Sequence, residues 1–589
     1  MSKWVVAAKR ADFDTIAKEL NVDPVLVRIM RNRELLTAED MRSFIEADKC
    51  TLHDPFLLND MDKAVNIISS KIDLGKRIRI IGDYDVDGIT STYILFNALS
   101  RMGALADYAI PNRITDGYGI NEHLIDEAVN AGVDTIITCD NGIAAKAVID
   151  KAKMSGITVV ITDHHEVPYE ENDGKRKYIY PNADAIINPK RDDSTYPYTG
   201  ICGAMVAYKL IVALSASHPL PQEELDMMRD MAAIGTVCDV MDICDENRVL
   251  VKQALANMEE HMNIGIAALR KVCEIDSKPI NVYQLGFVIG PCLNATGRLD
   301  DANTSIELLS SHDYRDAIVM ATKLKQLNDL RKAMTEQGIK DAFEYIENNN
   351  LADSKVLVVY LPDLHESLAG IVAGRIREKY YRPCFVLTKG EEGIKGSGRS
   401  IEGFHMYNEM VKCGQLFAKY GGHAMAAGLT LVDETPDRFI EAINDNCTMN
   451  IEDMFEKITI DVPMPLSYVT EDLIDQLDIL EPFGNGNPKP VFAQKNIMVC
   501  GVSLMGKEKN MAKIRMRENA TDFDGVLFRK VDELKNCIDE KYGEGTWDDL
   551  IKSGNRSGKN VLIDIIYYPA VNEFRGRRNI QYVIGDFKC

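Results

Sequence analysis

The sequence lacks any long apolar run, and this absence excludes several classes of protein. No stretch approaches the roughly 20 apolar residues that a membrane-spanning helix needs. The apolar patch near the start, Trp4–Ala8, is too short for the core of a signal peptide. We therefore expect a cytoplasmic protein that has no membrane partner.

The sequence also lacks paired cysteine motifs. Its thirteen cysteines are scattered, and no two of them form a CxxC pair. Such usage favours reduced, mostly buried thiols over a disulfide framework.

The sequence has fewer basic than acidic residues. The 68 Lys and Arg residues against 90 Asp and Glu residues give a net charge of −22. Because binding of nucleic-acid phosphates requires local positive potential, this balance excludes a surface that attracts nucleic acid everywhere. If the chain binds DNA, its cations must gather in one groove.

A chain of 589 residues is too long for one hydrophobic core, since cores stop growing near roughly 250–300 residues. Short apolar segments at 78–81, 135–138 and 157–161 alternate with helical patterns near 89–102 and 143–154. This alternation predicts crossover units and a buried parallel sheet, which a further strand near 185–187 extends.

In the second half of the chain, the pattern of apolar and polar residues changes twice. A long polar helix is expected over 314–347, followed by a second α/β unit that opens with a strand at 355–360. Past about residue 456, short alternating strands surround one helix near 531–540, which is typical of a small barrel of the OB type. The expected fold is therefore α/β and multidomain: an N-terminal helical segment (1–50), a parallel-sheet domain (51–312), a connecting helix (313–350), a smaller α/β domain (351–455) and a C-terminal OB-fold β-barrel (456–589).

Acidic residues stand where the predicted parallel strands end. The first strand ends in Asp83–Gly88 (DYDVDG), the second in Asp140–Gly142 (DNG) and the third in Asp163–His165 (DHH). The carboxyl ends of parallel strands share one edge of a sheet, and ligands bind there. Several carboxylates and two imidazoles are therefore expected in one small volume.

Carboxylates packed so closely repel one another and can all stay ionised only if cations lie between them. Mixed Asp and His ligands suit Mn²⁺, whereas an all-oxygen set would favour Mg²⁺. Two divalent ions can activate water and stabilise both the attacking and the leaving oxygen of a phosphate ester. A lone DxDG is more often a solvated loop, but three acidic strand ends in succession favour a two-metal phosphoesterase.

These motifs, with a later Asp239 in Gly235–Asp239 (GTVCD), resemble the ordered motifs of the DHH phosphoesterases. The segment Gly421–His423 (GGH) resembles the signature of the DHH-associated domain. Two further runs, Leu52–Phe56 (LHDPF) and Pro482–Pro488 (PFGNGNP), make the chain most similar to the RecJ single-strand-specific DNA exonucleases within that family. The resemblance covers nearly the whole chain.

The resemblance implies a role for each matched position in the metal site. His165 would face the scissile phosphate, and Asp140 would bridge the two ions. Asp239 competes with the nearby Asp242 and Asp245, which the sequence alone does not rank. The implied metal ligands are Asp85, Asp87, Asp140, His164 and Asp239, with Asp83 as a less secure ligand and Asp163 as a group that orients ligands.

A pocket for a 5′ phosphate and the nucleotides behind it is also implied. Arginine suits phosphate because its guanidinium donates paired, charge-assisted hydrogen bonds. An isolated arginine is more often a surface ion pair of little value, but these stand in matched, mostly glycine-rich contexts. The implied substrate-binding residues are Arg113, Arg298, Ser397, Arg399, Gly421, Gly422 and His423.

In the predicted barrel, cations are interleaved with aromatic residues. Such a pattern suits single strands, whose bases stack on rings. Core packing explains the aromatic residues equally well, so both interpretations stay open. The residues concerned are Arg575, Arg577 and Arg578 among Tyr567, Tyr568, Phe574 and Tyr582.

The function implied by the resemblance is 5′→3′ hydrolysis of single-stranded DNA to mononucleotides, dependent on two divalent ions, in DNA repair and recombination. A single-strand-binding protein and a DNA helicase are expected partners, and the chain is expected to be a monomer. One alternative is a DHH-family hydrolase of short oligonucleotides or other small phosphoesters. Another is a scaffold without chemistry, which the intact set of matched ligands disfavours.

Overall fold

The structure is a computed structural model that describes residues 2–113, 119–172, 175–299, 301–390, 393–553, 560–574 and 577–589. The chain forms two compact units. The larger unit comprises Trp4–Asn263, Asp276–Gly290 and Ile458–Cys589, and the smaller unit is built mainly from Ile264–Ile275 and Pro291–Lys457. Within the described residues, none of the helices is both long and apolar enough to cross a membrane.

The predicted parallel sheet is present in the larger unit. Its strands lie in the order β3-β2-β4-β5-β8, and each neighbouring pair is parallel. The register pairs Ile81 with Thr138 and Cys139 with Thr162, so the three central strands end at one edge. The bounds are β2 Arg77–Ile81, β3 Leu105–Ala109, β4 Thr135–Cys139, β5 Thr158–Thr162 and β8 Ala185–Ile187.

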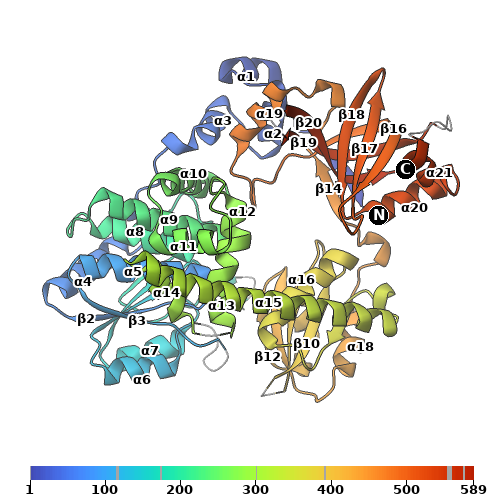
Figure 1. Cartoon of the computed structure of the whole chain (residues 1–589). Coiled ribbons are helices and arrows are strands. Elements are labelled where there is room, and N and C mark those ends of the chain that lie inside the picture. Colours follow the sequence, from blue (N-terminus) through green and yellow to red (C-terminus); the bar gives the residue numbers. More distant parts are fainter. Residues whose placement is uncertain are drawn as a thin grey trace. The chain divides into compact units, whose positions relative to one another are not determined.

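Helices cover both faces of this sheet (Figure 1). The crossover helices α6 and α7 pack on one face in a core with Ile136, Val159 and Ile161, while α5 packs against α8 and α9 on the other. The central strands are thus buried from both sides, as their continuous apolar sequences require. The helix bounds are α4 Met61–Asp73, α5 Val86–Arg101, α6 Glu122–Asn130, α7 Lys146–Met154, α8 Gly203–Leu214, α9 Gln222–Cys238 and α10 Asp245–Glu260.

The C-terminal part of the larger unit is a closed barrel, as predicted. Five strands pair in the order β16-β17-β18-β20-β19, and pairing of β16 with β19 closes the ring. In the sequence, helices α20 and α21 lie between β18 and β19. The bounds are β16 Phe492–Met505, β17 Met511–Glu518, β18 Thr521–Phe528, α20 Val531–Tyr542, α21 Thr546–Ser553, β19 Leu562–Phe574 and β20 Arg577–Lys588.

The N-terminal region consists mainly of short helices, as expected, and these share a core with the barrel. Leu26 and Met41 are buried in the same cluster as Leu477 and Ile565. A capping box begins α3: the Thr37 side chain accepts from the backbone N–H of Asp40, and the Asp40 side chain accepts from the backbone N–H of Thr37. The apolar patch near the start instead forms an unexpected strand. The bounds are β1 Lys3–Val6, α1 Phe13–Leu20, α2 Pro24–Asn32 and α3 Ala38–Ile45.

The smaller unit contains a mixed sheet and the predicted long helix. Its strands lie in the order β12-β13-β11-β10-β9, and among these only the pairing of β9 with β10 is parallel. The long helix α15 buries one side throughout its length, including Leu324 and Ile346. The bounds are α15 Tyr314–Asn348, β9 Leu357–Tyr360, α16 Ala369–Tyr380, β10 Cys384–Gly390, β11 Gly393–Arg399, β12 Phe417–Gly422, β13 Ala426–Leu431 and α18 Asp437–Asn446.

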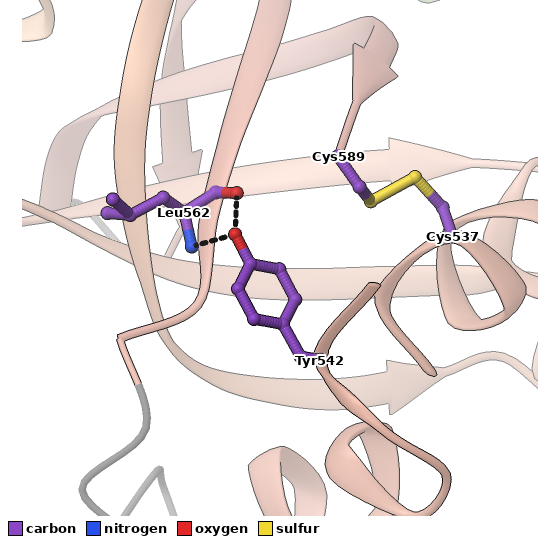
Figure 2. Close-up of a disulfide and its surroundings, with 4 residues drawn as sticks. All are labelled: Cys537, Tyr542, Leu562 and Cys589. Atoms are coloured by element: carbon purple, nitrogen blue, oxygen red, sulfur yellow. Dashed lines mark hydrogen bonds between the residues drawn. A yellow bond between two sulfur atoms is a disulfide. The ribbon is translucent and has the colours of Figure 1, made fainter. Parts of the chain in front are cut away.

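The expectation that the cysteines are all unpaired is wrong for two of them. Figure 2 shows a disulfide between Cys537 of α20 and Cys589, whose Cα atoms lie 5.8 Å apart. Beside it, the Tyr542 hydroxyl donates to the Leu562 carbonyl and accepts from the Leu562 N–H. The two cysteines are 52 residues apart in sequence, and folding of the barrel region brings them together. Their spacing alone therefore gave no sign of the pairing.

A buried arginine of α10 anchors the segment that leads into the barrel. Arg248 is 1% exposed, and its guanidinium lies 3.6 Å above the Phe44 ring. It donates to the Glu481 carbonyl at 2.8 Å, the Leu480 carbonyl at 3.1 Å and the Phe44 carbonyl at 2.9 Å. Burial lowers the pKa of Arg248 to about 9. The Arg248 side chain is thus the hydrogen-bond donor to several backbone carbonyls.

Replacement of this anchor should destabilise the larger unit. We expect Arg248→Met to lower the free energy of unfolding by about 3 kcal/mol or more, because buried carbonyls would lose charged donors. Denaturant titration followed by circular dichroism measures the loss. Arg42→Ala, which removes an exposed arginine paired with Glu19, is the control and should change little. Equal stability of the two variants would show that Arg248 is not an anchor.

Candidate metal centre and phosphate pocket

The predicted acidic strand ends meet at one edge of the sheet. Asp83 and Asp85 follow β2, Asp140 follows β4, and His164 follows β5. Since β4 lies between β2 and β5, the three strand ends are neighbours. The structure thus brings together residues that lie about 80 positions apart in the sequence.

His164 lies at the middle of this cluster. Its Nε2 atom is 3.1 Å from Asp140 Oδ1, 3.6 Å from Asp87 Oδ2 and 3.7 Å from Asp239 Oδ2. Asp239 caps the end of α9, so a fourth element contributes to the site. Three overlapping groups have ligand atoms within 4.8 Å of one another: Asp140, His164 and His165; Asp87, His164 and Asp239; and Asp83, Asp85 and Asp140.

Close packing fixes the side chain of Asp87. The backbone N–H groups of Gly203 and Ala204, in the first turn of α8, donate to its two oxygens at 2.6 and 2.9 Å. A helix N-terminus favours an ionised carboxylate. A Cβ atom at Gly203 would lie 2.7 Å from the Asp140 Cβ, so only glycine allows this approach. The sequence did not reveal this role of Gly203.

Asp163 orients the two histidines. Its Oδ1 accepts from the backbone N–H groups of His164 and His165, and it lies 2.7 Å from His165 Nδ1. Burial opposes ionisation, but the hydrogen bond from His165 and the charges of both imidazoles outweigh it and lower the pKa of Asp163 to about 2. Burial likewise opposes the charge on His165, yet Asp163 raises the pKa of that imidazole to about 9.

The carboxylates of the cluster resist ionisation. Burial, followed by repulsion from neighbouring carboxylates, raises the pKa of Asp140 and Asp83 well above the ordinary value. The same causes raise the pKa of Asp239 to about 8. Burial lowers the pKa of His164 to about 4, which keeps that imidazole neutral and able to bind a metal. Cations bound in the cluster would therefore stabilise the ionised form of these carboxylates.

The donor set fits divalent metal ions. Asp83 Oδ2 and His164 Nδ1 are buried and have no hydrogen-bond partner among the residues that the structure describes. Buried polar atoms of this kind usually have a partner, so a bound ion or water would explain them. Carboxylate oxygens together with one or two imidazole nitrogens match the mixed set predicted for Mn²⁺.

The loop after Asp239 is held by a residue whose role the sequence did not show. Val240 has φ +58°, a left-handed conformation that a β-branched residue rarely adopts. Asn485, in the segment before the barrel, donates to the Val240 carbonyl at 3.1 Å and to Asp242 Oδ1 at 2.7 Å. Its own carbonyl accepts from the Ile243 N–H at 2.7 Å. The glycine-rich run around Asn485 thus holds the loop that follows Asp239.

The rival acidic residues near Asp239 have other partners. Asp242 accepts the hydrogen bond from Asn485, and Asp245 lies 2.9 Å from His53 Nε2. Asp239, by contrast, lies within the ligand cluster. The geometry thus favours Asp239 as the ligand from this segment.

Of the predicted phosphate-binding residues, Arg113 belongs to the larger unit. Its guanidinium lies 4.8 Å from the centre of the Tyr84 ring. Its charge also partly offsets the rise in the pKa of Asp83, which burial and Asp85 cause. Arg113 therefore acts electrostatically on the metal cluster.

The other predicted phosphate-binding residues belong to the smaller unit. Arg298 donates to the Ser367 carbonyl at 2.6 Å, just before α16. A Cβ atom at Gly370, in the first turn of α16, would lie 2.8 Å from Arg399 Nη2. Both guanidiniums thus lie at the N-terminus of a twelve-residue helix, where backbone N–H groups also favour anions. The three features together suit a phosphate group.

Ser397 lies two residues before Arg399 on β11 and therefore on the same face of the strand. It pairs with Gly428, which in turn pairs with Gly421 of β12. Ser397 and Gly421 are thus at the same level of the sheet.

Gly422 has φ +150°, and a Cβ atom there would lie 2.5 Å from the Ala426 carbonyl oxygen, so the position requires glycine. His423 follows directly and is exposed.

The barrel aromatic residues are largely used for packing. Tyr567 and Tyr582 are 1% and 2% exposed, and their hydroxyls donate to the carbonyls of Met464 and Leu466. Tyr568 packs against the same core. Core packing is therefore the correct interpretation for these rings. Arg578 is exposed and lies 3.7 Å from Glu471, Arg575 lies outside the described residues, and the side chains of Phe574 and Arg577 are likewise not described.

Loss of the Asn485 amide should weaken metal binding. We expect Asn485→Ala to lower the affinity for Mn²⁺ about tenfold, because groups that orient ligands typically matter to that extent. Titration calorimetry of the metal-free protein measures the affinity directly. Asn510→Ala removes an asparagine of the same unit that donates to Glu508, and it should bind Mn²⁺ as the unchanged protein does. Identical Mn²⁺ affinities for both variants would contradict the role of Asn485.

Three domain families match the chain in the order of its folded parts. The DHH family N-terminal domain matches residues 77–236, the DHHA1 domain matches 353–449, and the RecJ OB domain matches 460–586. The last of these covers the barrel, and the first covers the sheet with its acidic strand ends.

Relatives and solved structures are similar over the full length. The single-stranded-DNA-specific exonuclease RecJ of Bacillus subtilis (strain 168) is 33% identical over 99% of this chain and 70% of that protein. The protein of the same name from Dickeya dadantii (strain 3937) is 32% identical over 94% of this chain and 95% of its own length. The crystal structure of Thermus thermophilus RecJ in complex with Mn²⁺ has the same fold, with a TM-score of 0.80 at 23% identity over 100% of this chain and 79% of that chain. The chain therefore belongs to the RecJ family of single-stranded-DNA-specific exonucleases.

Proposed function

We propose that this chain is a metal-dependent exonuclease that degrades single-stranded DNA from the 5′ end to mononucleotides. The observation that carries the proposal is the convergence of three acidic strand ends and Asp239 around His164, in a chain matched to the RecJ family over its full length. Hydrolysis of a phosphodiester is the reaction that such a cluster suits best.

The ligand assignment comes from the family resemblance, and the clustering of these side chains supports it. Asp85, Asp87, Asp140, His164 and Asp239 would hold two divalent ions, with Asp83 as a further ligand, and Mn²⁺ suits this set better than Mg²⁺. When bound, such ions supply Lewis acidity and activate water near neutral pH.

The remaining residues of the site position and stabilise the substrate. Asp163 holds His165 in one orientation and favours its positive charge, so that its imidazole can contact the scissile phosphate. Asp140 belongs to two of the three ligand groups and resists ionisation strongly, which suits a carboxylate shared between two cations.

The proposed polarity rests on the smaller unit. Arg298, Arg399 and Ser397 would hold a terminal 5′ phosphate at the N-terminus of α16, while Gly421, Gly422 and His423 would contact the nucleotides behind it. A terminal phosphate carries more negative charge than an internal one, so a pocket of two guanidiniums favours that end of a strand. In the larger unit, Arg113 beside Tyr84 would attract DNA phosphates at the metal cluster.

The wider setting is proposed from the family resemblance. The enzyme would act in the cytoplasm as a monomer in DNA repair and recombination, together with a single-strand-binding protein and a DNA helicase. The domain bounds proposed for it are 1–50, 51–312, 313–350, 351–455 and 456–589.

A polarity assay tests the proposed function. Single strands labelled at either end should release a labelled mononucleotide at once only from the 5′ end, and only with Mn²⁺ or Mg²⁺ present. Asp140→Ala should abolish cleavage while binding of the strand largely survives, because it removes a central ligand and leaves the phosphate pocket intact. Asp126→Ala removes an exposed aspartate paired with Lys151 and should cleave normally.

Immediate release from the 3′ end would overturn the polarity. Unchanged cleavage by Asp140→Ala would overturn the site. A dinucleotide cleaved as fast as a long 5′-phosphorylated strand would favour a small-substrate hydrolase instead.

The phosphate pocket makes a second prediction. Arg399→Ala should slow cleavage of a 5′-phosphorylated strand about 10- to 100-fold, the effect of losing a charged hydrogen bond of about 1.5–3 kcal/mol. Cleavage of a strand with a 5′ hydroxyl should fall far less, because that end lacks the group that Arg399 would bind. Arg399→Lys keeps the charge but loses the paired donors, so it should restore only part of the rate.

Arg375→Ala, which removes an exposed arginine of α16 paired with Glu378, is the matched control. Equal losses on both kinds of strand end would contradict the assignment of Arg399 to the 5′ phosphate.

A further inference from the structure

Two aromatic side chains of the larger unit are stacked on each other in solvent. Tyr283 of α12 (Val282–Gln284) is 66% exposed, and Phe287 of the π-helix η3 (Leu285–Ile289) is 67% exposed. Their ring centres lie 5.1 Å apart with an interplanar angle of 23°. Burial of a ring stabilises a fold, so two large rings left in water contribute little to stability and instead form an apolar surface open to a ligand.

This pair lies on a segment that contacts the metal-site helix. The Cys238 thiol donates to the Leu285 carbonyl at 3.6 Å, and a Cβ atom at Gly286 would lie 3.3 Å from Val237 Cγ1. Both Val237 and Cys238 belong to the last turn of α9, which ends at Asp239. The segment that bears the rings thus packs against the end of the helix that leads into Asp239, a proposed metal ligand.

The close approach is built into the sequence of the segment. A Cβ atom at Gly290 would lie 2.4 Å from the Cys238 thiol, so glycine is required there. The backbone between Leu285 and Ile289 is a π-helical turn, an arrangement often found at functional sites. The irregular turn and the glycine fix the ring-bearing segment against α9.

The chemistry of the pair suits one kind of ligand. Single-stranded DNA exposes its bases, and every base has a flat face that stacks on an aromatic ring. The barrel tyrosines Tyr567 and Tyr582, which the sequence offered for this task, are buried. The exposed aromatic pair, on the segment that packs against the end of α9, can stack on the bases instead.

We propose that Tyr283 and Phe287 form a stacking subsite for the bases of the DNA strand held at the metal centre. The proposal rests on the proposed function, because it takes single-stranded DNA as the substrate. Stacking does not depend on the hydrogen-bonding groups of a base, so the subsite accepts any base. A segment of the strand that lacks bases is not bound there.

Fluorescence of 2-aminopurine tests the subsite directly, because this base is quenched when it stacks. The probe is moved one position at a time along a 5′-phosphorylated single strand bound to Asp140→Ala protein with Mn²⁺. We expect quenching at one or two fixed positions from the 5′ end. Adding Phe287→Ala should abolish this quenching and weaken binding about 5- to 100-fold, the range for loss of stacking with one base. Phe287→Trp should retain both.

Three controls separate stacking from a structural role. Phe56→Ala removes another exposed ring of the same unit, 49% exposed, and should leave quenching and affinity unchanged. Phe287→Leu keeps an apolar side chain but has no ring, so under the proposal it behaves as Phe287→Ala does, whereas a structural role would leave it unaltered. If the DNA strand carries abasic sites at the quenched positions, the protein with Phe287 and its Phe287→Ala variant should bind that strand with equal affinity.

The outcomes distinguish the two proposals. If Phe287→Leu and the Tyr283→Ala/Phe287→Ala double variant bind and quench as Phe56→Ala does, the subsite is overturned while the nuclease stands. If the unaltered protein neither binds nor cleaves single-stranded DNA, the proposed function itself has failed.

Discussion

The metal site of the larger unit is governed by the mutual repulsion of buried carboxylates. Asp83, Asp140 and Asp239 converge from separate elements, and each has a pKa raised by burial and by its neighbours. Concentrated negative charge of this kind is costly in a fold unless a cation compensates it. We therefore expect bound divalent ions to stabilise this unit, because the carboxylates that repel one another would also bind Mn²⁺.

Other elements hold the cluster together against this repulsion. The N-terminus of α8 fixes Asp87, and Asp163 binds both histidine N–H groups and the ring of His165. Asn485 stabilises the strained turn after Asp239. The last contact comes from the segment that Arg248 also anchors, so the entry to the barrel packs against the loop that follows a proposed metal ligand.

Much of the site could be predicted from local sequence. Apolar strands that end in DYDVDG, DNG and DHH determine both a parallel sheet and the place where its acidic residues meet, because parallel strands share one carboxyl edge. The capping box at Thr37 and the helix from Tyr314 also follow from local patterns, since short-range hydrogen bonds and helical periodicity decide them. The resemblance to a known family then gave roles to residues such as Arg399 that no local pattern distinguishes.

What the sequence by itself determined is the chemistry of the site: which carboxylates and imidazoles stand at strand ends, and therefore which metals and which reaction they suit. Only the tertiary structure decided which side chains are buried and which are exposed. It placed Tyr567 in the barrel core and left Phe287 in water, and it joined Cys537 to Cys589. These outcomes depend on which residues far apart in the chain pack together, and no motif in the sequence specified these particular contacts.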